Sequence, residues 1–178
     1  MKTKKLLKEI DNHIQLTDDI LNSPGLVEKH LKPCGDDLIL LTLKGHLLIE
    51  NLLEINLCRL LAISSLPEKD NAKLEFHQKL KLLEAVVIAH EPNPNADLFC
   101  AIAKFNKIRN DLAHKLMTQD EIETAVNSII QSYQSKVDKK INLGQTPALQ
   151  LKNCIRKLCL FLCKVRIHFY KLERQSNE

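Results

Sequence analysis

One segment of the sequence restricts the possible folds more than any other. Residues 37–64 read DLILLTLKGHLLIENLLEINLCRLLAIS, a stretch with the length of a long helix and no proline. Leucine and isoleucine occupy most of its circumference, so a helix formed here must be covered on nearly every side. The segment therefore predicts a buried central helix with the rest of the chain arranged around it.

The rest of the chain has the spacing of further helices. Apolar residues recur every three or four positions, and proline or polar breaks separate the segments 3–21, 26–31, 72–89, 96–117, 118–140 and 147–174. Thr118 and Glu121 have the spacing of a capping box at the start of one of them. With four glycines and 4% aromatic residues, the composition favours helices over a β-sandwich.

These segments predict an all-α fold, an antiparallel bundle of four to five helices with an extra helix at each terminus. A chain of 178 residues is long enough for one domain with a substantial core. Within that single domain over 1–178, we expect an N-terminal helical extension over 1–35, the bundle over 36–141, and a basic C-terminal helix over 147–174.

The composition narrows the classes of function. A net charge of +4 permits nucleic-acid contact without requiring it. The six cysteines form no C-x-x-C pair, which favours free thiols in a reducing cytoplasm. We find no secretory signal, no apolar stretch of membrane-spanning length and no glycine-rich phosphate loop, so we expect no membrane partner and no cofactor. Zinc at Cys159 and Cys163, with Cys154 and His168 nearby, is a weaker alternative to buried thiols, and we expect no metal.

The helical segment AIAKFNKIRNDLAHKLM (101–117) combines an apolar stripe with polar side chains. The stripe is expected to be buried and consists of Leu98, Ile102, Phe105, Ile108, Leu112 and Leu116. Arg109, Asn110, Asp111 and His114 lie off it. Arg109 and His114 are about 140° apart around the axis, so both reach one phosphate only across a groove or through a second copy of the helix.

A second polar row lies on the central segment, where Thr42, His46, Glu50 and Glu54 follow each other at four-residue steps. Polar groups on an apolar helix are costly unless they pair or face a cleft. The row is therefore either one wall of a polar groove between two helices or the solvent face of the central helix. The sequence leaves both interpretations open.

Three stretches in order, KGHLLIENLLE (44–54), LEFHQKLKLLEAV (74–86) and FNKIRNDLAHKL (105–116), resemble the HEPN superfamily over roughly 37–140. The R-N-x-x-x-H core of that family is present as Arg109, Asn110 and His114. The resemblance implies an up-down bundle of four to five helices. It also implies a metal-independent ribonuclease of toxin–antitoxin, phage-defence or RNA-processing systems, usually dimeric with two motif copies in one cleft. One toxin subgroup has a tyrosine where this chain has Leu116.

The expected function is metal-independent endoribonucleolytic cleavage of RNA by its 2′-OH, as a toxin or defence effector. Arg109 would hold the phosphate and His114 would transfer protons. Asn110 and Asp111 would support them, and His46 and Glu50 would line the cleft. The expected RNA-backbone contacts are Lys107, Lys115, Lys152 and Arg156. The expected partners are RNA, a second copy, and an antitoxin or regulatory protein. The alternative is a non-catalytic module that dimerises and binds RNA, a nucleotide or a regulatory protein.

Overall fold

The computed structural model describes residues 25–61, 74–90, 96–134 and 145–175. Every element in them is a helix, which confirms the all-α class. The elements in chain order are α2 (Gly25–Leu31), the short 3-10 helix η1 (Lys32–Cys34), α3 (Leu38–Leu60), α4 (Phe76–His90), α5 (Ala96–His114), α6 (Gln119–Gln134) and α7 (Pro147–Gln175). The helix expected over 3–21 lies outside the described residues.

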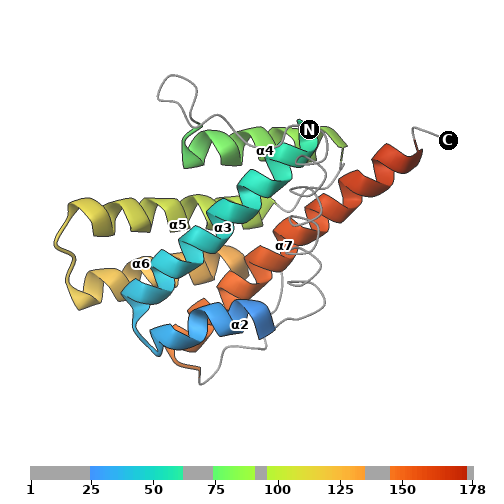
Figure 1. The fold of residues 1–178 in the computed structure, drawn as a ribbon. Coiled ribbons are helices and arrows are strands. Elements are labelled where there is room, and N and C mark those ends of the chain that lie inside the picture. Colours follow the sequence, from blue (N-terminus) through green and yellow to red (C-terminus); the bar gives the residue numbers. More distant parts are fainter. Residues whose placement is uncertain (1–24, 62–73, 91–95, 135–144, 176–178) are drawn as a thin grey trace, which may run out of the picture.

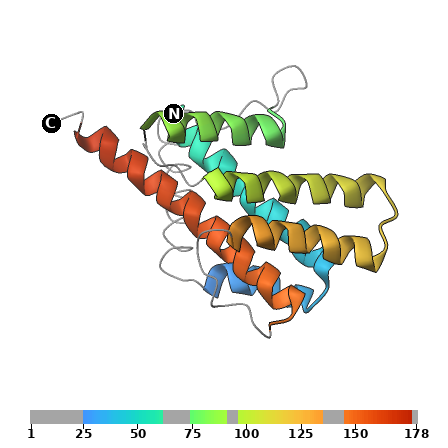
Figure 2. The same ribbon diagram turned by 180° about the vertical axis from the view of Figure 1, so that it is seen from behind.

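The helices form a bundle in which α3 and α7 cross the others. In Figure 1, α4, α5 and α6 run roughly parallel to one another, and α3 and α7 cross them as an adjacent diagonal pair. Figure 2 shows the same arrangement from behind, with α3 passing behind α5 and α6. The C-terminal end of α7 projects beyond the other helices in both views. Consequently α3 has neighbours on most of its sides.

Helix α3 is the central element that its sequence predicts. Asp37 caps its start, where the side-chain Oδ1 accepts a hydrogen bond from the Leu40 N–H at 3.0 Å. Apolar side chains along its whole length are buried, among them Leu41, Ile49 and Leu53, which are fully enclosed. At roughly 2 kcal/mol for each buried leucine or isoleucine, this one helix accounts for a large share of the hydrophobic stabilisation of the bundle.

Helix α7 is the most extensive partner of α3. The sequence predicts it as an addition to the bundle, but its apolar side lies inside the core. Its buried residues recur at three- and four-residue steps and include Leu151, Ile155, Leu158 and Leu162. The end of the chain is therefore part of the hydrophobic core, and the bundle over 36–141 does not bury α3 by itself.

Gly45 sets how closely α3 approaches its neighbours. A Cβ at this position would lie 2.6 Å from Cδ1 and 2.8 Å from Cγ1 of Ile155 on α7, and 3.3 Å from a ring carbon of Phe105 on α5. Real side chains do not tolerate the two shorter contacts without moving. The glycine therefore allows α5 and α7 to pack against α3 at the same level.

The prediction for the end of α5 is wrong at Leu116. This residue was expected in the buried stripe, but α5 ends at His114 and Leu116 is fully exposed, with a relative accessibility of 104%. The chain turns here because α6 begins almost at once, with the predicted capping box. The Thr118 N–H donates to Glu121 Oε2 at 2.7 Å, and the Glu121 N–H donates to Thr118 Oγ1 at 3.3 Å. Ile102, Phe105 and Ile108 are buried as expected.

None of the six cysteines is disulfide-bonded, and all are buried except Cys100. Burial raises the pKa of Cys154 to about 12, and it raises the pKa of Cys159 as well. Such thiols stay protonated at neutral pH and behave as small hydrophobic side chains. In the part of the chain that the structure describes, no group of three or more His, Cys, Asp or Glu side chains is placed to hold a metal ion. None of the helices described there is long and apolar enough to cross a membrane.

We expect Gly45→Val to lower the free energy of unfolding by about 2 kcal/mol, because the new side chain collides with Ile155 in a filled core. Urea unfolding followed by circular dichroism measures this. Ala85→Val is the matched control, since Ala85 is exposed on α4 and valine there costs only helix propensity, below about 1 kcal/mol. Equal losses in the two variants would contradict the close packing at Gly45.

Candidate functional site

The polar row of α3 faces the interior of the bundle. Thr42 and His46 are buried, and Glu50 and Glu54 are half-buried. Thr42 Oγ1 donates to the Leu38 carbonyl at 2.7 Å, whereas the next three residues of the row contact α4 and α5. The structure therefore favours the groove over the solvent face as the interpretation of this row.

The row forms one wall of a polar hollow between α3, the start of α4 and the middle of α5. The hollow has a volume of about 280 Å³. The sequence pattern indicated four of its lining residues, which are His46, Glu50, Arg109 and Asn110. It did not indicate the others, which are Asn106, Leu74, Glu75, Phe76 and His77. Asn106 was recognisable because it lies one turn before Asn110, but nothing in the sequence places Glu75 or His77 beside Arg109.

His46 links α3 to α5 at the base of the hollow. Its side chain is 3% exposed, and its ring stacks on Phe76 with a centroid separation of 4.5 Å. Nε2 lies 3.2 Å from Asn106 Oδ1, and Nδ1 lies 3.8 Å from Glu50 Oε2. Burial lowers the pKa of His46, and the charge of Arg109 lowers it further. The hydrogen bond to Asn106 and the charge of Glu50 act in the opposite direction but do not cancel this shift. The neutral ring with its proton on Nε2 satisfies this geometry.

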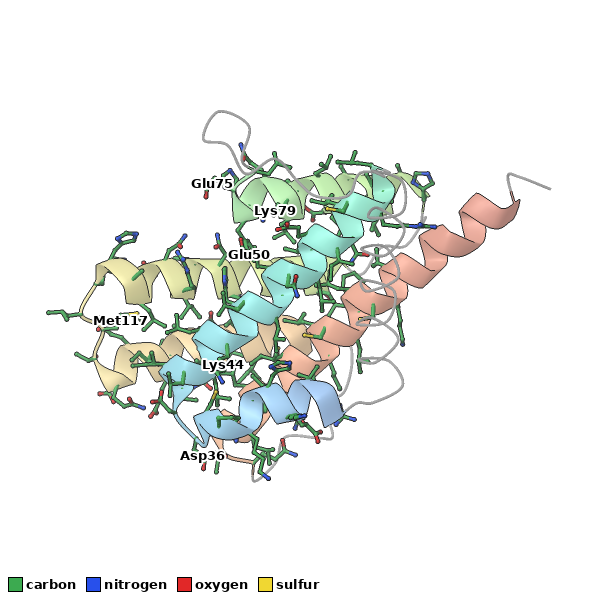
Figure 3. The ribbon with its side chains drawn as sticks, in the orientation of Figure 1. Asp36, Lys44, Glu50, Glu75, Lys79 and Met117 are labelled. Carbon is green, nitrogen blue, oxygen red and sulfur yellow. The ribbon has the colours of Figure 1, made fainter. Side chains whose placement is uncertain are left out.

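A buried lysine binds the acidic end of the same row. Lys79 on α4 is 6% exposed, and its Nζ lies 3.1 Å from Glu54 Oε2 and 3.5 Å from Glu50 Oε1. Figure 3 shows Lys79 and Glu50 where α4 passes α3, with Glu75 nearby. A buried ammonium group is tolerated only with such partners. The cluster holds α4 against α3 and compensates the carboxylate that lines the hollow.

Arg109 and Asn110 form the outer wall of the hollow. Both are exposed, and Arg109 Nη1 donates to Asn110 Oδ1 at 3.1 Å. No carboxylate among the described residues forms an ion pair with Arg109. The guanidinium group is therefore an available cation at the mouth of a polar hollow, which is an arrangement suited to a phosphate oxygen.

The structure separates His114 and Asp111 from this hollow. His114 is exposed at the C-terminal end of α5, and within the described residues it forms no hydrogen bond or ion pair. Met117, at the left of Figure 3, marks that end of the helix, well away from Glu50. Asp111 accepts from Lys115 Nζ at 2.6 Å, and this bond holds the pKa of its carboxyl below the usual range. Together with Lys107, Asp111 lines a different groove, between α5 and α6.

Three of the four basic residues expected to contact an RNA backbone form ion pairs within the chain. Lys152 pairs with Asp36 at 3.2 Å, and Arg156 pairs with Glu28 at 3.1 Å. Both line a groove of about 570 Å³ between α2 and α7, and Lys115 is paired with Asp111. Lys107 is exposed. Arg109 thus differs from Lys115, Lys152 and Arg156, whose charges are compensated by acidic neighbours.

Comparison of the chain with protein-family models, with curated proteins and with solved structures finds no match. The function is therefore inferred from the side chains and their geometry.

We expect the free energy of unfolding to fall as the pH is lowered from 7.5 to 5, with His46 responsible for part of the loss. Its pKa is lower in the folded chain than the ordinary value of 6.5. The unfolded chain therefore binds more protons in this range, and the stability is fully present only above it. His46→Gln, which keeps an amide donor, should reduce the pH dependence measured by urea unfolding at each pH.

The matched control is Thr42→Val, at a buried position of the same row of α3 whose side chain does not titrate. It should leave the pH dependence close to that of the original chain. If His46→Gln has the same pH dependence as the unmodified protein, the burial of a neutral histidine at this position is disproved.

Proposed function

We propose that this protein is a metal-independent endoribonuclease that acts in the cytoplasm as a toxin or defence effector. The observation that favours this function most is the polar hollow, in which Arg109 and Asn110 of α5 face His46 of α3 and His77 of α4. A guanidinium with no ion-pair partner among the described residues, set beside the amides of Asn106 and Asn110, is suited to bind a phosphate. Proton transfer is assigned to His114, which lies outside the hollow of its own chain. The resemblance of roughly residues 37–140 to the HEPN superfamily supports the same function.

The proposed reaction begins with the 2′-OH of the RNA attacking the adjacent phosphorus. A histidine takes the hydroxyl proton, Arg109 stabilises the negative charge on the pentacovalent phosphate, and a proton is delivered to the departing 5′-oxygen. The products are a 2′,3′-cyclic phosphate and a 5′-OH. DNA has no 2′-OH, so it should not be cleaved, and neither a metal nor a cofactor is required.

We propose that His114 enters the reaction through a second copy of the chain. His114 follows Arg109 by about 7.5 Å along the helix axis and about 140° around it. In a symmetric dimer that packs the exposed sides of two α5 helices together, each Arg109 meets the His114 of its partner. Cys100, Ala103, Lys107 and Asn110 are exposed on α5 and would lie at this interface.

A non-catalytic binding module is the second candidate function. The observation in its favour is the distance of His114 from the hollow in a single chain, where it has no partner among the described residues. In this case the dimer would bind RNA, a nucleotide or a regulatory protein such as an antitoxin without cutting it. The two candidates differ in one outcome, which is whether purified protein cleaves RNA.

We expect purified protein to cleave total RNA in EDTA, and we expect Arg109→Ala and His114→Ala each to lower the rate at least about 100-fold. Both side chains are exposed, so their melting temperatures should stay within about 2 °C of the unmodified protein. His90→Ala is the matched control and should cleave normally. Intact RNA after incubation with the unmodified protein would favour the binding module. Normal cleavage by His114→Ala would show that His114 takes no part in the reaction.

Mixing the two inactive variants tests whether the site is shared between chains. In an equal mixture, half of the dimers contain one chain of each kind, and each of these has one site with both Arg109 and His114 intact. The mixture should therefore regain about a quarter of the original cleavage rate. If Arg109 and His114 act within one chain, mixing restores nothing.

A further inference from the structure

We infer that the hollow between α3 and α5 is a receptor for one phosphate group of RNA, and that Asn106 is a phosphate-binding residue in it. Asn106 lies outside the R-N-x-x-x-H pattern, and Asn110 assists it from the next turn of α5. The inference concerns binding, and it rests on the proposed function only for the choice of RNA as the ligand.

The side-chain amide groups of Asn106 and Asn110 direct their oxygens toward donors of the protein. Asn106 Oδ1 lies 3.2 Å from His46 Nε2, and Asn110 Oδ1 accepts from Arg109 Nη1 at 3.1 Å. Each oxygen is therefore occupied by a donor, provided that the His46 proton is on Nε2. The long separation of 3.8 Å between Nδ1 and Glu50 leaves Nε2 as the position that forms a hydrogen bond.

The side-chain amide nitrogens of both asparagines are available to a ligand. With both oxygens engaged, Nδ2 of Asn106 and Nδ2 of Asn110 have no acceptor among the described residues. Both side chains line the hollow beside the guanidinium group of Arg109. Four amide N–H groups and the guanidinium fork are donors only, and an anion with several acceptor oxygens, such as a phosphodiester, complements such a set.

The charges around the hollow are mixed, and Arg109 is the cation that would attract an anion to it. Lys79 is shared between Glu54 at 3.1 Å and Glu50 at 3.5 Å, so it compensates Glu50 in part, and Arg109 has no ion-pair partner among the described residues. Glu75, the other acidic lining residue, is exposed to solvent, which screens its charge. His46 adds no positive charge when neutral, so its role is to position Asn106 by holding the amide oxygen.

The size of the hollow limits what it can hold. Its volume of about 280 Å³ lies just below the range for small-molecule sites, roughly 300–1,000 Å³. One phosphate with its adjoining sugar occupies such a space, whereas a folded RNA element does not. The hollow therefore fits a single backbone position of a strand that continues over the surface of α5.

Binding of a 2′-O-methyl oligoribonucleotide tests the inference separately from cleavage, because this probe has no free 2′-OH and is not cut. Fluorescence anisotropy at a fixed low salt concentration gives the affinity. Asn106→Asp keeps an acceptor for His46 but loses the donors, so it should fold normally and bind at least about tenfold more weakly. Asn106→Ala should also bind several-fold more weakly, which separates loss of the donors from added negative charge.

The matched control is Asn127→Asp, which introduces the same charge at an exposed position of α6. It should bind within about twofold of the unmodified protein. Asn106→Ala leaves His46 without its partner and should melt a few degrees lower, so all affinities are compared well below the melting transition of every variant. Unchanged affinity in Asn106→Asp and Asn106→Ala would overturn the inference even if the protein cleaves RNA. Failure of the unmodified protein to bind the probe would overturn it too, and the EDTA cleavage assay would then decide the proposed function by itself.

Discussion

A buried polar contact ties α3 to each of its three principal neighbours. His46 meets Asn106 of α5, Asn56 Nδ2 donates to the Leu162 carbonyl of α7 at 3.2 Å, and Lys79 of α4 binds two carboxylates of α3. An unsatisfied polar group in a core of leucine and isoleucine costs roughly 1–3 kcal/mol. Hydrophobic burial alone would allow these helices to slide or rotate, whereas the three contacts specify one position for each.

The candidate site follows from the same constraint. The contact between His46 and Asn106 fixes α5 so that Arg109 and Asn110 line the hollow, and Lys79 of α4 compensates part of the negative charge of Glu50 and Glu54. Gly45 contributes by letting α5 and α7 approach α3 closely. A polar row that stabilises the bundle therefore also prepares a surface of hydrogen-bond donors, and the proposed phosphate site needs no additional loop or metal.

The sequence predicted the features that depend on residues close together in the chain. The helices of the described residues and the capping box at Thr118 follow from local spacing and are present. Contacts between helices were not predictable in this way. The pairing of Lys79 with α3 and the entry of His77 into the hollow depend on how α4 packs. Leu116 was misplaced because its helical spacing continues past the residue at which the chain turns into α6.

The central claim is that the hollow between α3 and α5, and not the basic groove between α2 and α7, receives the RNA backbone. Titration of the labelled protein with a 2′-O-methyl dinucleotide, followed by two-dimensional amide NMR, tests it most directly. The account predicts that the side-chain amide signals of Asn106 and Asn110 and the guanidinium signal of Arg109 shift first and together. Shifts confined to the residues around Lys152 and Arg156 would contradict it.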